Sequence, residues 1–155
     1  MNEVVKLLAE LKKTIATMES CSGGAVVNAI TNIPGASEVL KFSVVTYANE
    51  FKIKMGVDKD LIDKYSVYSM EVAKNMSLKI TEFANSNYGI GITGKINRKD
   101  PYNEEGKDNE IFISIYDKDK AKYITFKLIA MSADREKNKE YIVEEIAKKL
   151  LAILG

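Results

Sequence analysis

The sequence predicts an α/β domain in which a mixed, mostly parallel sheet lies between two layers of helices, a three-layer α/β/α sandwich. In the first two thirds of the chain, segments with strand character alternate with segments whose apolar residues recur at helical spacing. A hairpin pattern and then a helical pattern complete the chain. Because the 155 residues show no linker, internal repeat or low-complexity segment, we expect one domain over residues 1–155.

The first half of the chain shows the alternation clearly. Apolar residues at helical spacing predict a helix over residues 4–11, and a β-branched run predicts a strand over 14–18. A second helix is expected over 25–30, ending before the helix breaker Pro34-Gly35. Alternating apolar residues then predict a strand over 39–47.

The second half is marked by helix caps and a hairpin turn. Asp58 is expected to cap a short helix through residue 64, and Ser69 is expected to cap a longer one. A last helix is expected from about Asp134. The other expected elements are a strand over 88–93, a polar loop over 94–109, and a hairpin of strands over 111–116 and 122–129.

Charge and composition favour a small-molecule partner. The net charge is +1 and basic residues are interspersed with acidic ones, so the chain lacks the electrostatic footprint of a nucleic-acid-binding protein. No apolar run approaches the roughly 20 residues that span a bilayer, and the first residues lack a signal-peptide pattern. Cys21 is the only cysteine and cannot form an internal disulfide. We therefore expect a cytoplasmic protein with no membrane or nucleic-acid partner.

The chain contains no histidine, which restricts its chemistry. Ser-His-Asp and Cys-His activation of a nucleophile are excluded, and the commonest transition-metal ligand is absent. A proton shuttle in this protein would have to use lysine, tyrosine or a carboxylate.

Two glycine-containing segments resemble phosphate-binding loops to different degrees. Gly89, Gly91 and Gly94 match the dinucleotide pattern G-x-G-x-x-G, but they fall in a predicted strand that no helix follows, so we interpret the match as accidental. The turn at residues 20–24 does join a strand to a helix. It could bind an anion, or Ser22 could simply cap the helix.

A serine, a tyrosine and a lysine in the first third together suggest amide hydrolysis. Individually, Ser37 would be a helix cap, Tyr47 a strand aromatic and Lys52 a solvated helix residue. Together they supply a hydroxyl nucleophile, a phenol that relays a proton and a lysine that can act as base when neutral. That role requires the pKa of Lys52 to fall from about 10.4 to near 7, through desolvation or nearby positive charge. The charged run over residues 135–140 is interpreted as the solvated face of the last helix.

Several segments occur here in the order and spacing of a known family. The sequence resembles the CinA C-terminal domain family, whose members include competence/damage-inducible proteins and nicotinamide-nucleotide amidases. The similarity covers most of the chain and is most specific between residues 14 and 73. It is carried by Met18-Glu19-Ser20-Cys21-Ser22-Gly23-Gly24, Ile33-Pro34-Gly35-Ala36-Ser37, Val44-Val45-Thr46-Tyr47-Ala48-Asn49-Glu50-Phe51-Lys52 and Met55-Gly56-Val57.

The resemblance implies hydrolysis of the carboxamide of nicotinamide mononucleotide, a step of pyridine nucleotide salvage, without metal or cofactor. The positions that match the family's catalytic residues are taken as Ser37, Tyr47 and Lys52. In the expected mechanism, Lys52 takes the proton of Ser37 directly or through Tyr47. Substrate contacts are expected from Ser20, Cys21, Ser22, Gly23, Gly24, Thr46, Asn49, Thr93 and Gly94.

Other interpretations stay open. After Thr93-Gly94 the chain departs from the family pattern over residues 95–110, so a domain that binds a nucleotide or another partner without hydrolysis is the alternative. Cys21 could be the nucleophile, although a small buried thiol fits better in a chain without histidine. A homo-oligomer formed through the apolar last helix is a further expectation.

Overall fold

The computed structural model describes residues 1–97, 102 and 106–155. Within these residues, five strands and six α-helices follow one another with one short 3-10 helix, η1. Parts of the expected polar loop, residues 98–101 and 103–105, lie outside the described residues. The elements are α1 Asn2–Glu10, β1 Ile15–Glu19, α2 Ala25–Thr31, η1 Ala36–Glu38, β2 Val44–Val45, α3 Asn49–Lys54, α4 Lys59–Tyr65, α5 Met70–Ala84, β3 Tyr88–Gly94, β4 Glu110–Asp117, β5 Lys122–Ile129 and α6 Arg135–Leu154.

The strands form one mixed sheet in the order β2-β1-β3-β4-β5. β1 pairs in parallel with both β2 and β3, whereas β4 runs antiparallel to β3 and to β5. Among the described strands, β4 alone therefore runs against the common direction, as a hairpin at the end of a parallel sheet requires. The predicted α/β fold with a mixed sheet is confirmed.

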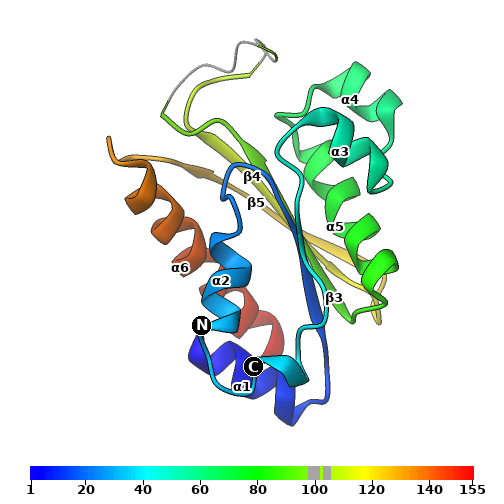
Figure 1. Cartoon of the computed structure of the whole chain (residues 1–155), viewed down its shortest axis with the longest axis vertical. Helices are drawn as coiled ribbons and strands as arrows, with labels where there is room; N and C mark the ends of the chain where they lie inside the picture. Colours follow the sequence, from blue (N-terminus) through cyan, green and yellow to red (C-terminus); the bar gives the residue numbers. More distant parts are fainter. Residues whose placement is uncertain (98–101, 103–105) are drawn as a thin grey trace.

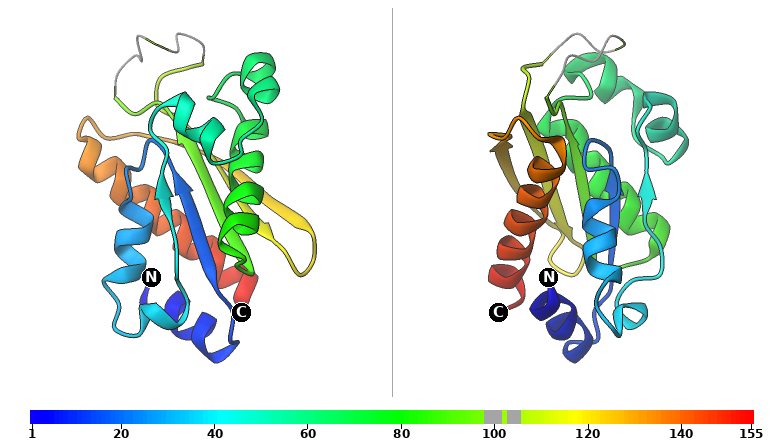
Figure 2. Two further views of the ribbon diagram at one scale, coloured as in Figure 1. Left: turned by 45° about the vertical axis from the view of Figure 1, so that its right-hand side comes forward. Right: turned by 60° about the vertical axis from the view of Figure 1, so that its left-hand side comes forward.

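Helices cover both faces of the sheet, which makes three layers. Helices α1, α2 and α6 lie on one face, and α3, α4 and α5 lie on the other (Figures 1 and 2). The first core is formed between the sheet and α1, α2 and α6, with Leu8, Ile30 and Ile146 among its fully buried residues. The second core packs α5 against β1 through Met18 and Met76. Burial of apolar surface on both faces is the main force that holds the layers together.

Side-chain caps begin three of the helices where the sequence predicts them. Asp58 accepts a hydrogen bond from the N–H of Asp60, and Ser69 accepts one from the N–H of Val72. Asp134 accepts from the second and third residues of α6. These starts depend on local hydrogen bonds, which is why a local pattern predicts them. Among the described helices, none is long and apolar enough to cross a membrane.

The second strand is much shorter than predicted. Of the expected strand over residues 39–47, only Val44 and Val45 pair as a strand with β1. The N–H of Thr17 donates to the Ser43 hydroxyl instead of a backbone carbonyl, so a side chain interrupts the ladder. The segment still runs beside β1, because the N–H of Ile15 donates to the carbonyl of Val39 at 2.8 Å.

Gly89 and Gly91 serve close packing between β3 and α5. A Cβ on Gly89 would lie 1.9 Å from the Thr81 hydroxyl, and one on Gly91 would lie 2.3 Å from the Ala73 carbonyl. Both residues, with Gly94, lie inside β3 and not in a turn before a helix. The interpretation of the dinucleotide pattern as accidental is confirmed, since this fingerprint needs its glycines at a helix N-terminus.

Candidate active site

The candidate site lies at the carboxyl ends of the parallel strands β1 and β2. The turn over residues 20–24 follows β1, residues 46–48 follow β2, and α3 returns over this end of the sheet (Figure 1). Parallel strands bring the loops that follow them to the same edge, so segments distant in sequence meet here.

Lys52 is buried in the centre of this site. The side chain enters from α3, and the residue is 2% exposed. The Nζ atom donates hydrogen bonds to the Ser20 hydroxyl at 3.0 Å and to the carbonyls of Thr46 at 2.7 Å and Tyr47 at 3.4 Å. The expectation of a desolvated lysine is confirmed, and the interpretation of Lys52 as a solvated helix residue is wrong.

Ser20 is held at the end of β1 with its hydroxyl facing Lys52. Its N–H donates to the carbonyl of Ile92 on β3, which continues the sheet ladder by one residue. The residue is 8% exposed, so its hydroxyl lies at the boundary between the core and solvent. A serine hydroxyl in contact with a buried lysine amine is the arrangement that Ser-Lys hydrolases use to activate a nucleophile.

Ser37 lies at the other end of β1 and does not join this arrangement. It is exposed within η1, and Gly35 occupies the cap position that Ser37 was expected to fill. The nearby Val39 pairs with Ile15, whereas Ser20 is five residues further along, which corresponds to roughly 16 Å of extended strand. Figures 1 and 2 show η1 near α1 and α3 at the opposite end. The predicted transfer of a proton from Ser37 to Lys52 is therefore corrected, because the two residues lie at opposite ends of β1.

Tyr47 contacts Lys52 through its carbonyl and not through its phenol. The side chain is 61% exposed. Its hydroxyl accepts a hydrogen bond from Nη2 of Arg135 at 3.3 Å. Tyr47 thus borders the site, with its hydroxyl directed toward α6.

Glu19 organises the turn that carries Ser20, a role that the sequence analysis missed. The carboxylate is fully buried and accepts hydrogen bonds from the side chains of Thr17 and Ser22 and from the N–H groups of Val26 and Val27. It therefore caps α2, in which Gly24 rather than Ser22 is the N-cap residue. The sequence does contain a signal for this role, since an acidic residue at the end of the strand is followed shortly by two glycines.

Cys21 is a buried, neutral thiol. Burial, more than any other cause, raises the pKa of this thiol from 9.0 to about 12. A thiol with this pKa carries almost no thiolate near pH 7. The interpretation of Cys21 as a small buried residue is confirmed, and the role of nucleophile does not fit.

Among the other expected contacts, Thr46 and Asn49 lie at the site. Thr46 is fully buried, and its Oγ1 has no hydrogen-bond partner among the described residues. Asn49 is the first residue of α3 and is partly exposed. The unpartnered hydroxyl of Thr46 beside Lys52 is of the kind that a ligand or a water satisfies.

Thr93 and Gly94 have structural partners instead. The Thr93 hydroxyl donates to the carbonyl of Val67 at 2.7 Å. A Cβ on Gly94 would lie 2.5 Å from the carbonyl of Glu110, so the glycine allows β4 to approach β3. The structure gives neither residue a contact with Lys52 or Ser20 among the described hydrogen bonds.

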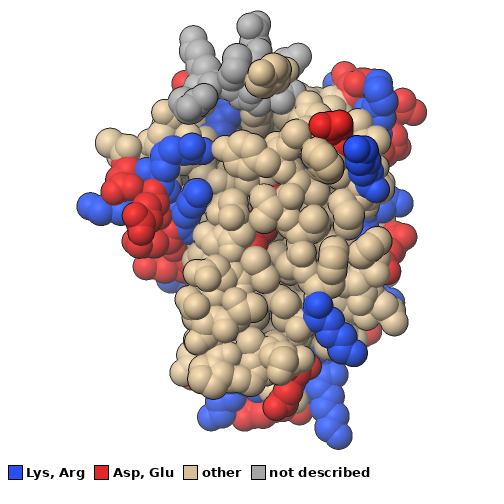
Figure 3. Space-filling model, in the orientation of Figure 1, with Lys and Arg blue, Asp and Glu red and all other residues tan. Residues whose placement is uncertain are grey.

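The charged run at the start of α6 is only partly solvated, which corrects the sequence interpretation. Asn138 is 1% exposed, and Arg135 and Lys139 are partly buried. The Arg135 side chain reaches Tyr47, and Lys139 Nζ lies 3.1 Å from the position that a Cβ on Gly23 would take. Lys and Arg atoms lie where the start of α6 meets the face that holds this turn (Figure 3).

The described residues contain no group of three or more His, Cys, Asp or Glu side chains that could hold a metal ion. The side chains gathered at the site are a lysine, a serine, a threonine and one saturated carboxylate. Their arrangement is suited to acyl transfer through serine, assisted by an amine.

Comparisons with known proteins relate the whole chain to one family. A protein from Clostridium kluyveri named as competence-damage inducible is 46% identical over 96 residues, which are 61% of this chain and 23% of the relative. A CinA-like protein from Flavobacterium psychrophilum is 39% identical over 113 residues, which are 71% of this chain and 26% of the relative. The chain therefore corresponds to about a quarter of the length of these relatives.

Solved structures share the fold. The crystal structure of a competence or damage-inducible protein from Enterobacter asburiae matches with a TM-score of 0.88 at 21% identity, covering 99% of this chain and 98% of that one. The competence/damage inducible protein CihA from Agrobacterium tumefaciens matches with a TM-score of 0.88 at 20% identity, covering 99% and 92%. The family model of the CinA C-terminal domain matches residues 1–154. This chain belongs to the CinA C-terminal domain family.

Proposed function

We propose that the protein hydrolyses the carboxamide of nicotinamide mononucleotide to nicotinic acid mononucleotide and ammonia, as the family resemblance implies. The observation that carries the proposal is the buried hydrogen bond between Lys52 Nζ and Ser20 Oγ. Ser20 takes the role of nucleophile that the sequence analysis gave to Ser37, because Ser20 alone of these two contacts the lysine. Lys52 keeps its expected role as base.

In the proposed mechanism Lys52 acts as a neutral amine, a role that requires a desolvated side chain, and the residue is 2% exposed. A neutral amine has two N–H groups and one lone pair. The lone pair can accept the proton of the Ser20 hydroxyl, whose oxygen lies 3.0 Å from Nζ. In this form, the Ser20 hydroxyl becomes the donor, and its oxygen is activated for attack.

The reaction then proceeds through an acyl-enzyme. Lys52 takes the proton of Ser20 as Oγ bonds to the carboxamide carbon, and it returns that proton to the nitrogen as the C–N bond breaks and ammonia leaves. Water next attacks the ester, and Lys52 takes its proton and passes it to Ser20 Oγ as the ester bond breaks. The products are the carboxylic acid and the original enzyme.

The turn after Ser20 can stabilise the negatively charged oxygen of the tetrahedral intermediate. The N–H groups of Ser22 and Gly24 have no hydrogen-bond partner among the described residues. The N–H groups of Val26 and Val27, in the first turn of α2, are bonded to Glu19 and are not available to the oxyanion. We assign the oxyanion to the turn and an amide contact to the unpartnered Thr46 hydroxyl.

Release of ammonia from nicotinamide mononucleotide by the purified protein tests the proposal. The wild type is compared with Ser20→Ala and Ser37→Ala, and the folding of each variant is checked by circular dichroism. We expect release by the wild type and Ser37→Ala and none by Ser20→Ala. A folded wild-type protein that binds the nucleotide without releasing ammonia would support the alternative function, a non-catalytic nucleotide-binding domain.

A further inference from the structure

Two basic side chains of α6, Arg135 and Lys139, lie beside the turn that carries Ser20. We propose that they form a phosphate-binding site, through which the protein selects nucleoside monophosphates over the corresponding nucleosides. The inference rests on the proposed function, because it places the reacting part of the ligand at Ser20. Arg135 and Lys139 bind the phosphate at the other end of the same ligand.

Arg135 has hydrogen-bonding capacity that the described residues leave unused. Its Nη2 donates to the Tyr47 hydroxyl at 3.3 Å, whereas its Nε is buried and has no partner among the described residues. A buried N–H without an acceptor is unfavourable and calls for a ligand atom. A phosphate oxygen is well suited, because the planar guanidinium can bind an anion with two parallel hydrogen bonds.

Lys139 lies one helical turn after Arg135, on the same side of α6. Residues four apart on a helix are neighbours on its surface. Lys139 Nζ lies 3.1 Å from the place of a Cβ on Gly23, so a side chain at this position would displace the amine. Gly23 also has a φ of +62°, a conformation that favours glycine. The absence of a side chain at Gly23 therefore leaves room for the positively charged end of Lys139 between the turn and α6.

The backbone at the start of α2 is not available for the phosphate. The carboxylate of Glu19 occupies the N–H groups of Val26 and Val27. Glu19 is also the nearby negative charge, but four hydrogen-bond donors already satisfy it, and it is fully buried. Since the unpartnered N–H groups of Ser22 and Gly24 are assigned to the oxyanion, the phosphate must be bound by side chains from another element. Arg135 and Lys139 are those side chains.

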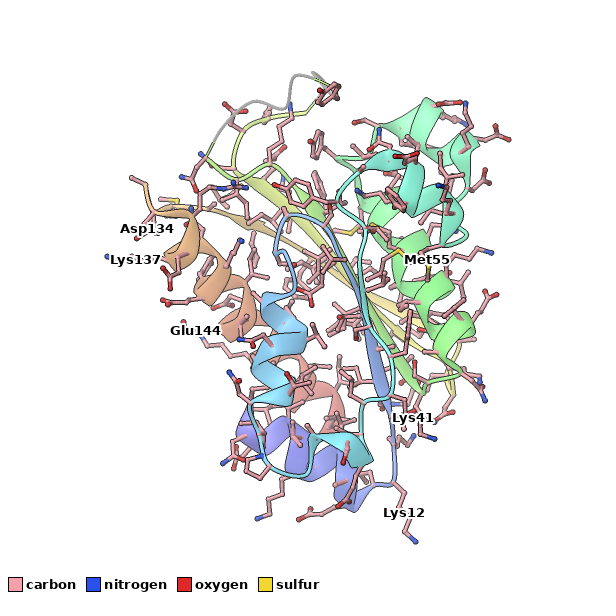
Figure 4. The ribbon with its side chains drawn as sticks, viewed as in Figure 1. Lys12, Lys41, Met55, Asp134, Lys137 and Glu144 are labelled. Atoms are coloured by element: carbon pink, nitrogen blue, oxygen red, sulfur yellow. The ribbon has the colours of Figure 1, made fainter. Side chains whose placement is uncertain are left out.

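A buried network fixes the start of α6 in this position. Asn138 Nδ2 donates to Asn97 Oδ1 at 2.7 Å and to the carbonyl of Ser132 at 2.9 Å. The N–H of Ser132 donates in return to Asn138 Oδ1 at 3.0 Å. These bonds set the rotation of the first turns of α6, with Asn138 inside and Lys137 on the exposed outer side (Figure 4). Lys137 is therefore a matched control on the same turn.

Isothermal titration calorimetry with nicotinamide mononucleotide and nicotinamide riboside tests the proposal, using wild-type α6 and the variants Arg135→Gln, Lys139→Gln and Lys137→Gln. Each protein also carries Ser20→Ala, so that the ligand is not hydrolysed during the titration. For the mononucleotide, we expect Kd to rise by about 10- to 100-fold in each of the first two variants, as loss of a charged hydrogen bond predicts. For the riboside, we expect a change below about threefold, and Lys137→Gln should leave both Kd values within about twofold of those with wild-type α6. Tyr47→Phe separates the contact of Arg135 with the phenol from its contact with phosphate, and we expect it to leave the preference for the mononucleotide unchanged.

The outcomes separate this inference from the proposed function. Equal affinity of the protein with wild-type α6 for the two ligands, or no binding of the mononucleotide, would overturn the phosphate site. An equal loss for both ligands in Arg135→Gln and in Lys139→Gln would also overturn it. Retained discrimination without release of ammonia would support the phosphate site and reject the amidase. Thermal unfolding of each variant shows whether a lost affinity reflects lost folding.

Discussion

The amino group of Lys52 donates a hydrogen bond to the hydroxyl of Ser20 at 3.0 Å, within a site where Lys52 is almost fully buried. The two residues are 32 positions apart in sequence and come from α3 and from the turn after β1. Replacing either residue therefore tests the proposed transfer of a proton from the Ser20 hydroxyl to the Lys52 amine.

Replacing each candidate serine by alanine should separate their roles. Ser20→Ala removes the hydroxyl that faces Lys52, so we expect ammonia release to fall at least about 10³-fold. Ser37→Ala removes an exposed hydroxyl in η1, and we expect activity within about twofold of wild type. Initial rates with nicotinamide mononucleotide give the comparison. Loss of activity in Ser37→Ala with Ser20→Ala fully active would reject our assignment.

Lys52→Met should abolish activity while leaving the fold intact. Methionine fills similar volume without an amine, so the base is lost but the packing of α3 is largely kept. We expect a rate reduction of at least about 10³-fold, with circular dichroism like that of the wild type. Lys54→Met, an exposed lysine on the same helix, is the matched control. Equal rates in the two variants would exclude Lys52 as the base.

Cys21 should react slowly and be dispensable. Because burial raises the pKa of its thiol to about 12, little thiolate exists at pH 8. We expect iodoacetamide to label the folded protein far more slowly than the urea-unfolded protein, as mass spectrometry would measure. Cys21→Ala should keep activity within about threefold, because the thiol has no part in the proposed steps. Rapid labelling that removes activity would argue for a catalytic thiol.

The same thiol should lower stability in alkaline solution. The unfolded chain releases the proton near the ordinary pKa of 9.0, whereas the folded chain keeps it until about 12. The folded state binds more protons between these values, so the free energy of unfolding falls as pH rises from 9. Between pH 8 and 10, we expect the wild type to lose about 1 kcal/mol more than Cys21→Ala in urea unfolding. Parallel losses in the two proteins would contradict this account.

Glu19→Gln should destabilise the protein and weaken the site. The glutamine amide presents N–H groups where the carboxylate accepts from Val26, Val27 and other donors, so the buried network loses acceptors. We expect the free energy of unfolding to fall by about 2 to 4 kcal/mol in urea titrations. Glu38→Gln changes an exposed carboxylate and should alter stability by less than about 0.5 kcal/mol. A similar effect in both variants would show that the network contributes little.

The sequence predicts the fold well because its signals are local. Caps at Asp58, Ser69 and Asp134 and the turn before β5 depend on neighbouring residues, and the structure contains all of them. The second strand is overestimated because the Ser43 hydroxyl replaces a backbone acceptor, a substitution that alternation does not reveal. The apolar residues of α6 pack on the sheet, so they offer no reason for the expected homo-oligomer, which stays a prediction.

The site is predicted less completely because its contacts are not local. The sequence identifies Lys52 and the segment 20–24, and the structure brings them together. It does not distinguish Ser20 from Ser37, because both follow short apolar segments and only the sheet places them at opposite ends. The charged neighbours of Arg135 predict a solvated side chain. Its contact with Tyr47, 88 positions away, depends on the fold and has no signal in the sequence around Arg135.

The anchoring of Lys52 also bears on how this domain can diversify. Two of its acceptors are the carbonyls of Thr46 and Tyr47, only five and six positions earlier, and Ser20 is set by β1 and β3. Among the described residues, the contacts of the reactive pair come from the sheet and the short segment over residues 46–52. Sequence changes that preserve the pairing of β1 with β2 and β3 can therefore alter other surfaces of the domain while these contacts are kept.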